Sequence, residues 1–277
     1  THNPGNVPMS RLSSLSVLLA LPLLACSSSE EPSESDSGAT DTAPSDVVLD
    51  RYYTVNNCNT NAPIEGLELC DSPIETGVET CGTTDANGQV MTTWINPPLA
   101  TNVSIKTSHS EYPTVITTGH YDEDGYNTAV EIIEEGGRVE GTLCSFNKST
   151  SDDFMAGGDL TPEEGMGQIW FGLYSNDNDD VSGAVVESTN AEGELVDQVM
   201  YQGGVTGALN PEATTTSGRG RLIGYNLLPG DYTVTVVHDS LDCVSEAWAF
   251  QELEPNVIPV PVEANTWTNA FVDCSPR

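Results

Sequence analysis

A short alternating stretch near the C-terminal end constrains the fold of this chain more than any other feature. Residues 214–237 read TTTSGRGRLIGYNLLPGDYTVTVV. After a Pro-Gly-Asp turn, Tyr232, Val234 and Val236 alternate with threonines. Apolar residues at every second position, bounded by Gly and Pro, indicate a strand with one buried face. Residues 83–107 carry a similar pattern, so we predict two copies of one β unit.

The composition favours many short strands. The chain of 277 residues holds 25 Gly and 17 Pro, and only 6% of its residues are aromatic. Such frequent turn residues are typical of all-β domains. We therefore predict an all-β fold with two tandem small antiparallel β-sandwiches, in residues 51–126 and 166–277. Residues 127–165 are interpreted as a connector with a short helix over Thr128–Glu135, which the glycine pair that follows would end.

The chain is strongly acidic. Asp and Glu number 42 against 8 Lys and Arg, which gives a formal net charge of −34. Nucleic acid is excluded as a partner because phosphate binding needs clustered basic residues, and an anionic membrane surface would repel the folded body. Such an excess of carboxylates is typical of a solvated surface that keeps an exported protein soluble. Adaptation to salty water and capture of divalent cations are the alternatives.

The N-terminal segment indicates export. Arg11 precedes an apolar run over residues 12–25 that is too short to span a bilayer, which takes about 20 apolar residues. A basic residue before a short apolar run is typical of a secretory signal, so residues 1–25 are predicted to be a signal peptide. Residues 26–50 are rich in Ser, Asp, Glu and Pro and hold little to bury, which predicts a disordered tether.

The end of the apolar run has a specific motif, Leu23-Leu24-Ala25-Cys26. It resembles the lipobox of bacterial lipoproteins. The resemblance implies cleavage before Cys26 and acylation of that cysteine, which anchors the chain because each buried CH₂ contributes about 0.8 kcal/mol. Ser27, in place of an Asp, implies sorting to the outer membrane, with the protein facing the periplasm or the exterior. A plain cleaved signal with a fortuitous cysteine is the alternative.

Three short motifs follow one another in a characteristic order. They are PIEGLEL at Pro63–Leu69, TTDANG at Thr83–Gly88 and LPGDYTVTV at Leu228–Val236. In this order they resemble the carboxypeptidase regulatory-like domain, a transthyretin-related β-sandwich. The first unit departs from the family pattern at Asn96–Leu99, where Asn-Pro-Pro-Leu replaces the Pro-Gly turn. The resemblance implies a domain without catalytic residues that accompanies peptidases, glycan-binding proteins or transport receptors.

The cysteines predict a disulfide framework. Besides Cys26 there are six, and an even number in an exported chain indicates disulfides, for which 15 pairings are conceivable. Our preferred pairs are Cys243–Cys274, Cys70–Cys81 and Cys58–Cys144. The first pair holds the two cysteines of residues 166–277, and the second joins adjacent predicted strands. The absence of a Cys-x-x-Cys motif disfavours a zinc ribbon or a thioredoxin-like site.

Two acidic clusters are candidate calcium loops. Their carboxylates are Asp122, Asp124, Asp177, Asp179 and Asp180. Oxygen donors on loops are the ligands that Ca²⁺ prefers, although neither cluster fits the helix-loop-helix calcium pattern. Solvated loops are the alternative, because so acidic a chain produces such clusters by chance. No other cofactor is predicted.

No convincing catalytic constellation is present in the sequence. His109, His120 and Asp122 are candidate ligands of a metal, and exposed loop residues are the alternative interpretation. Iron dioxygenases of a similar sandwich fold need a His-x-His pair, and serine hydrolases of the α/β type need a Gly-x-Ser-x-Gly elbow. Neither motif occurs here. The interpretation of the chain as a metal-dependent enzyme is therefore less favoured.

The sequence as a whole predicts a non-enzymatic, lipid-anchored protein of the cell envelope that acts as a binding or structural module. The alternative is an accessory subunit that binds carbohydrate or peptide in a surface complex. Candidates for a stacking platform are Trp94, Trp170, Trp248 and Trp267. Burial of each tryptophan in a core is the competing interpretation. The expected partners are the membrane, through the anchor, and an envelope protein or glycan.

Overall fold

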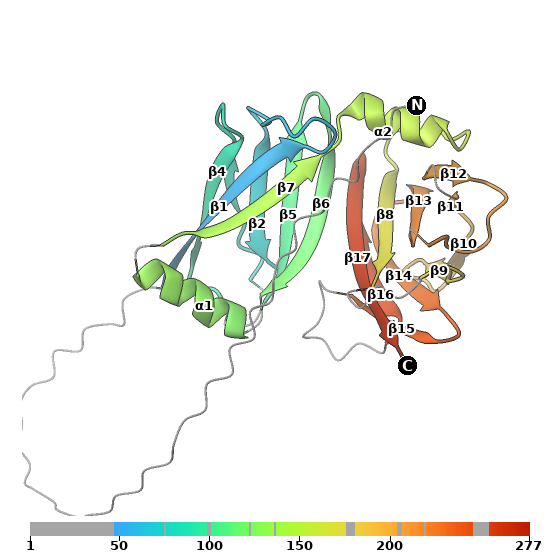
Figure 1. Cartoon of the computed structure of the whole chain (residues 1–277). Helices are drawn as coiled ribbons and strands as arrows, with labels where there is room; N and C mark the ends of the chain where they lie inside the picture. The colour runs from blue at the N-terminus through green and yellow to red at the C-terminus, as the bar shows by residue number, and fades with distance from the viewer. Residues whose placement is uncertain are drawn as a thin grey trace, which may run out of the picture. The chain divides into compact units, whose positions relative to one another are not determined.

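Most of the regular secondary structure in the described chain is β-strand (Figure 1). The computed structural model describes residues 47–74, 76–98, 101–121, 123–135, 137–175, 181–203, 207–218, 220–245 and 255–277. The strands are β1 (Val48–Asn57), β2 (Glu68–Pro73), β3 (Thr80–Thr83), β4 (Gln89–Ile95), β5 (Thr101–His109), β6 (Tyr112–Tyr121), β7 (Val139–Ser145), β8 (Gly167–Tyr174), β9 (Val185–Thr189), β10 (Leu195–Val196), β11 (Val199–Gly203), β12 (Ala208–Asn210), β13 (Arg221–Leu227), β14 (Gly230–Val237), β15 (Leu241–Ser245), β16 (Val257–Val262) and β17 (Thr266–Pro276). The helices among these residues are α1 (Glu123–Glu134) and α2 (Lys148–Ala156). The predicted all-β, sandwich-type fold is confirmed.

One long sheet organises the structure. Its strands follow the order β12-β11-β13-β8-β17-β6-β5-β2-β3, and β15 pairs with the end of β17. Two smaller sheets have the orders β4-β1-β7 and β10-β9-β14-β16. The two halves of the long sheet join in its middle, where β17 pairs in parallel with β6, from Thr266 opposite Thr114 to Asn269 opposite Thr117. The first and second sandwich therefore share one hydrogen-bonded ladder.

The two smaller sheets cover opposite faces of the long sheet. Side chains directly opposite each other on paired strands point to the same face. Ile105 lies opposite Thr117, which lies opposite Asn269. Asn269 in turn lies opposite Trp170. Ile105 packs in a core with β1, and Trp170 packs with α2, so the sheet β4-β1-β7 and α2 share this face. Phe171 points the other way, into the core formed with β14 and β16.

The predicted alternation decides which side chains fill the second core. In β14, Tyr232, Val234 and Val236 are 5%, 2% and 2% exposed, whereas the threonines between them are half-buried. This burial confirms the half-buried strand inferred from residues 214–237. The largest fully buried side chain, Phe171 of β8, packs into the same core.

Three disulfides join strands of the described body. They are Cys58–Cys144, Cys70–Cys81 and Cys243–Cys274. The first ties the chain just after β1 to β7, the second joins β2 to β3, and the third joins β15 to β17. These are the three pairs that the sequence analysis preferred.

The range interpreted as a connector, 127–165, contains a strand. This strand, β7, pairs in parallel with β1 and completes the sheet β4-β1-β7 of the first sandwich. Its side chains are exposed or half-buried except at Ser145, and β7 lies at the edge of its sheet. Apolar residues alternate only weakly in β7, so the sequence pattern did not predict this strand. The same range ends with α2, which packs on the second sandwich through Met155.

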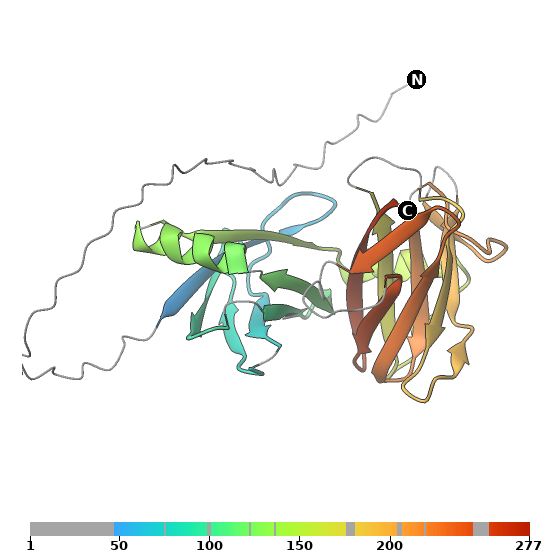
Figure 2. The same cartoon turned by 90° about the horizontal axis from the view of Figure 1, so that it is seen from below.

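Helix α1 begins five residues before the predicted Thr128 and ends at Glu134, one residue before the predicted Glu135. The backbone N–H of Gly137 donates to the carbonyl of Ile132 at 2.7 Å, which closes the last turn. Ala129 is buried in the first core, so the helix covers one end of that sandwich (Figure 2). Neither α1 nor α2, the helices of the described residues, is long and apolar enough to cross a membrane.

Two prolines make β16 an edge strand, as predicted from Pro259 and Pro261. Proline has no backbone N–H and is excluded from strands that pair on both sides. Within the described sheets β16 pairs with β14 alone. On its other side the carbonyl of Pro261 accepts a hydrogen bond of 2.7 Å from the Thr268 hydroxyl of β17. This contact helps to close the second sandwich.

Candidate functional site

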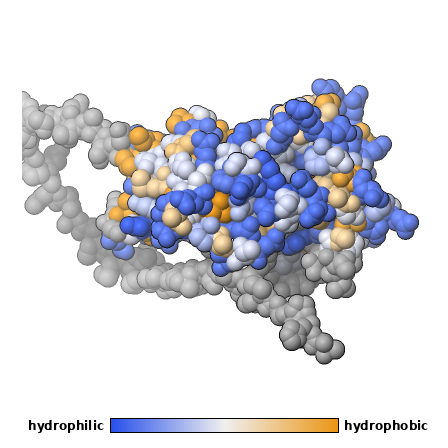
Figure 3. Space-filling model, turned by 90° about the horizontal axis from the view of Figure 1, so that it is seen from above, coloured by the Kyte–Doolittle hydropathy of each residue, from blue (hydrophilic) through white to orange (hydrophobic). Residues whose placement is uncertain are grey.

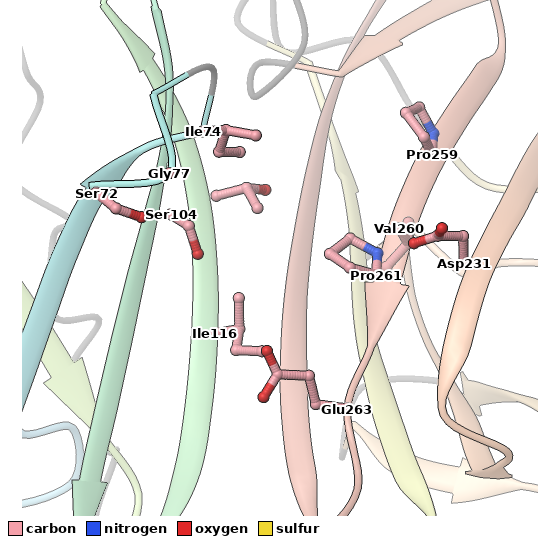
Figure 4. Close-up of a pocket in the computed structure, with 11 residues that line it drawn as sticks. Ser72, Ile74, Gly77, Ser104, Ile116, Asp231, Pro259, Val260, Pro261 and Glu263 are labelled. Carbon is pink, nitrogen blue, oxygen red and sulfur yellow. The ribbon is translucent and has the colours of Figure 1, made fainter. Parts of the chain in front are cut away.

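A groove of about 590 Å³ lies between the first sandwich and the edge of the second, and we call it the corner groove (Figure 4). Its lining residues are Ser72, Ile74, Gly77, Ser104, Ile116, Thr118, Asp231, Pro259, Val260, Pro261 and Glu263. One wall comes from β2, β5 and β6, and the other from β14, β16 and the residue after β16. The two walls belong to different sandwiches, so the groove exists because β6 and β17 are paired.

The corner groove is mostly apolar. Isoleucine side chains and hydroxyls form one wall, and the proline-rich edge forms the other (Figure 4). The carboxylate of Glu263, a lining residue, is paired with the ammonium group of Lys106 on β5. Because the prolines supply no N–H, this edge cannot add a further strand through a regular ladder. The groove therefore offers an apolar surface without a free row of hydrogen-bond donors.

A second groove, of about 310 Å³, lies beside α2, and we call it the tryptophan groove. Its lining residues are Pro113, Thr114, Lys148, Ser151, Asp152, Pro162, Glu163, Met166, Gln168, Asn265, Thr266 and Trp267. They come from the starts of β6, β8 and β17, from α2, and from the loop that precedes β8. An aromatic side chain, two carboxylates, an ammonium group and several amides and hydroxyls thus meet in one place.

The loop wall of the tryptophan groove is held by two asparagines. Asn226 and Asn265 have positive φ angles of 49° and 57°, a conformation that Asn tolerates better than most residues. The side-chain oxygen of Asn226 accepts the N–H of Glu163 at 3.0 Å, and its amide donates to the carbonyl of Thr161 at 3.0 Å. The side-chain oxygen of Asn265 accepts the N–H of Gly165 at 2.8 Å. The loop is therefore preorganised by β13 and by the turn before β17.

An aromatic cluster supports Trp267 from behind. The ring of Trp170 lies 6.4 Å from that of Trp267 and 4.9 Å from that of Phe154, measured between centroids. Both tryptophans are half-buried against the apolar contacts of Met155 and Ile223. Trp267 lines the groove, whereas Trp170 is not among its lining residues. The indole of Trp267 is thus held rigid on a strand while part of it stays open to the groove.

Charged groups stand on two sides of the tryptophan groove. Asp152 projects from α2, and Glu163 belongs to the loop; both residues are exposed. The ammonium group of Lys148 donates to the carbonyl of Ser110 at 3.0 Å, which holds this side chain against the β5–β6 turn. The groove therefore presents hydrogen-bond acceptors, with one cation at its rim.

The titratable group with the most unusual surroundings lies elsewhere, in the first core. Asp71 is 0% exposed. Its carboxylate accepts bonds from Arg51 at 2.9 and 3.0 Å, from the Tyr53 hydroxyl at 2.6 Å and from the Thr92 hydroxyl at 3.1 Å. Burial raises the pKa of Asp71 above its ordinary value, against the lowering effect of Arg51 and the hydrogen bonds. A carboxylate sealed in this way cannot reach a ligand, so we assign the cluster a structural role.

Most of the predicted calcium ligands lie outside the described residues. These are Asp122, Asp177, Asp179 and Asp180, whereas Asp124 lies on α1. Calcium binding therefore stays a prediction. In the described part of the chain, one group with metal-ligand spacing is Cys70, Glu79 and Cys81. The two cysteines form a disulfide, so their sulfurs are not available as thiolate ligands.

The two histidines of the candidate metal site lie toward opposite ends of the β5–β6 hairpin. His109 stands beside the turn of the β5–β6 hairpin, opposite Tyr112. His120 stands toward the far end of β6, opposite Asn102. The Nδ1 atom of His109 accepts the N–H of Glu111 at 3.0 Å, so this ring serves the turn. Asp122, the third proposed ligand, lies outside the described residues.

The four tryptophans divide into different environments. Trp94 is 3% exposed and lies in the first core, which confirms the burial interpretation for this residue. Trp248 lies outside the described residues. Trp170 and Trp267 are neighbours, and only the latter lines a groove. The sequence did not single out Asp152 or Glu163, because only the tertiary structure brings them beside Trp267.

Comparison with known proteins identifies no family for this chain. No family model matches it, so the resemblance to the carboxypeptidase regulatory-like domain stays a prediction. No curated protein matches its sequence.

Among solved structures, 83% of the chain aligns with the TIE protein of Bacillus anthracis, at 12% identity and a TM-score of 0.27, and covers 34% of that protein. The same share aligns with GBS52, the minor pilin of Streptococcus agalactiae, at 11% identity and a TM-score of 0.27, over 96% of that chain. It also aligns with the shaft pilin SpaA of Lactobacillus rhamnosus GG, at 10% identity and a TM-score of 0.24, over 98% of that chain. Scores of this size establish no shared function, so function has to be inferred from the chain's own residues.

Proposed function

We propose that this chain is a lipid-anchored protein of the cell envelope that acts as a binding or structural module and not as an enzyme. The observation that carries the proposal is Cys26, which directly follows the apolar run 12–25 and directly precedes an acidic, Ser-rich segment. Acyl chains on this cysteine hold the protein at a membrane. The acidic segment between Cys26 and the start of β1 at Val48 then spaces the folded body from the lipid, because its like charges repel one another.

The folded body supports a location outside the cytoplasm. Its six described cysteines form three disulfides, which form and persist in oxidising compartments. Hydrophilic residues cover much of the face shown in Figure 3, in keeping with the net charge of −34. The identity of Ser27 favours the outer membrane as the destination.

The arrangement of polar groups supports binding in preference to chemistry. The tryptophan groove combines a rigid aromatic side chain with exposed acceptors on a preorganised loop. A preformed surface of this kind lowers the entropic cost of binding. The carboxylate of Asp71, whose pKa burial raises, is enclosed in the first core and lines neither groove.

Metabolic labelling with an alkyne fatty acid tests the anchor. We expect the full chain to incorporate the label and to sediment with membranes, and Cys26→Ser to lose both properties. Ser27→Ala is the matched control and should keep both. A non-reducing gel that shows intact disulfides in Cys26→Ser demonstrates that its body still folds. Undiminished acylation and membrane retention of a folded Cys26→Ser chain would contradict the proposal.

A further inference from the structure

We propose that the tryptophan groove binds a neutral carbohydrate chain. This proposal rests on the proposed function in one respect: the location in the cell envelope determines the compartment in which the protein meets its ligand. The groove is formed by α2, the loop before β8 and the first residues of β6, β8 and β17. Its volume of about 310 Å³ is at the lower end of the ~300–1,000 Å³ usual for small-molecule sites, which suits a short stretch of a sugar chain.

The first argument is the indole of Trp267. A pyranose ring has C–H groups on its faces and hydroxyls around its rim, so it packs a face on an aromatic ring while its rim stays polar. Trp267 is held on β17, with Trp170 at 6.4 Å behind it. The side chain therefore offers a fixed apolar surface and loses little rotational freedom when a ligand binds.

The second argument is the placement of acceptors around that surface. Asp152 belongs to α2 and Glu163 to the loop, so exposed acidic residues from two elements line the same groove as Trp267. Sugar hydroxyls are hydrogen-bond donors, and a bond to an ionised carboxylate is about twice as strong as a neutral one. Lys148 adds a donor at the rim for a hydroxyl or ring oxygen.

The third argument is that the backbone of the loop that carries Glu163 is already held in place. Asn226 and Asn265 tie the loop at Thr161, Glu163 and Gly165. The loop does not have to become ordered when a ligand binds. The free energy of the weak sugar contacts is therefore not offset by an entropic cost of ordering the site.

Charge and backbone chemistry select among ligands. The chain carries a net charge of −34, so an anionic polysaccharide is repelled before it reaches the groove. A peptide that adds as a strand needs free backbone donors and acceptors. Here the N–H groups of Glu163 and Gly165 are already bonded to asparagine side chains. A neutral carbohydrate meets neither obstacle.

The test uses the purified full chain labelled with ¹⁵N, in which each of the four tryptophans gives one indole N–H signal. The probes are neutral oligosaccharides of glucose, mannose, galactose and N-acetylglucosamine, added singly to about 10 mM, a level that detects Kd values of millimolar order. An oligogalacturonate and a neutral Ser-Ala peptide are the comparison ligands. We expect a neutral oligosaccharide to shift the Trp267 signal, with the buried Trp94 signal unchanged, and the two comparison ligands to leave the Trp267 signal in place.

Variants then locate the site. Trp267→Ala should abolish binding, and Asp152→Asn and Glu163→Gln should each weaken it about tenfold. Asp153→Asn is the matched control, because this exposed neighbour on α2 does not line the groove. If Trp267→Ala does not fold, the two carboxylate variants decide, since both side chains are exposed.

The proposal is overturned if no neutral oligosaccharide moves the Trp267 signal. It is also overturned if only the peptide or the anionic probe moves that signal, or if binding survives the groove variants. The acylation assay on Cys26 is independent of this outcome, so failure of the site and failure of the anchor are distinguishable.

Discussion

At the scale of single residues, the Arg51–Asp71 pair shows how a charged group is accommodated in so small a core. The guanidinium carbon of Arg51 lies 4.3 Å from the centre of the Trp94 ring and 5.2 Å from that of Tyr53. Asp71 accepts bonds from three side chains. Both charges are thus compensated where water is excluded. A buried pair is costly to break, although an apolar replacement of both partners is tolerated.

We expect Asp71→Leu alone to lower the free energy of unfolding by about 3–5 kcal/mol, because it removes the carboxylate that compensates the buried Arg51 charge. Combining it with Arg51→Met should recover most of that loss. Thr92→Val is the control and should cost about 1 kcal/mol, the value of one hydrogen bond. Urea unfolding of the full chain measures all three. A loss of under about 1 kcal/mol for Asp71→Leu would show that the pair contributes nothing.

At the scale of elements, β17 is the strand on which the second sandwich depends. It pairs in parallel with β8 and β6, and its end pairs with β15 in antiparallel. Its inward residues, such as Val272 at 0% exposure, fill the second core, and Trp267 on its outward face lines the groove. Cys274 fastens its end to Cys243 of β15, and both cysteines are 1% exposed.

We expect removal of this disulfide, as Cys243→Ala with Cys274→Ala, to lower the free energy of unfolding by about 3–4 kcal/mol through the loss of loop closure. The empty volume left in the core adds to the loss. Removal of Cys70–Cys81 by the same double substitution is the comparison. That bridge closes a shorter loop, with a sequence separation of 11 against 31, and Cys81 is exposed, so its loss should be smaller. Equal losses for the two bridges would contradict the importance of core packing here.

At the scale of the whole described body, the continuous sheet couples the two sandwiches. The first core is built on β1, β2, β4 and β5, and the second on β8, β14, β16 and β17. The two cores have no residue in common. The sandwiches are nevertheless connected through the backbone, because β6 of the first is hydrogen-bonded to β17 of the second. Strands that are hydrogen-bonded in one ladder tend to open together.

We therefore expect hydrogen exchange to report one cooperative unit. Ile105→Ala, which creates a cavity in the first core, should speed exchange in β14 of the second sandwich as well as in β5. Mass spectrometry after exchange of the full chain measures both segments. Exchange that accelerates in β5 but not in β14 would mean that the sandwiches unfold independently.

Local patterns were sufficient for the features that depend on neighbours in the sequence. The alternation in β14 predicted which of its side chains are buried, because successive residues of a strand point to opposite faces. Pro259 and Pro261 predicted an edge strand, because each lacks the donor that an inner strand needs. The disulfide between Cys243 and Cys274 could be predicted because these are the two cysteines of the second predicted sandwich. The motif that ends at Cys26 likewise depends only on neighbouring residues, and it supports the lipid anchor proposed above.

The pairing of distant segments was decided only in the tertiary structure. Strand β7 joins β1 in parallel, and β17 joins β6, although nothing in either local sequence specifies the partner. Every residue except proline offers the same backbone donor and acceptor, so partner choice depends on how whole layers pack. The tryptophan groove depends on this pairing of strands. The sequence marked Trp267 as a candidate because it is aromatic. Asp152 and Glu163 line the same groove only because α2 and the loop before β8 fold against the same face of the sheet.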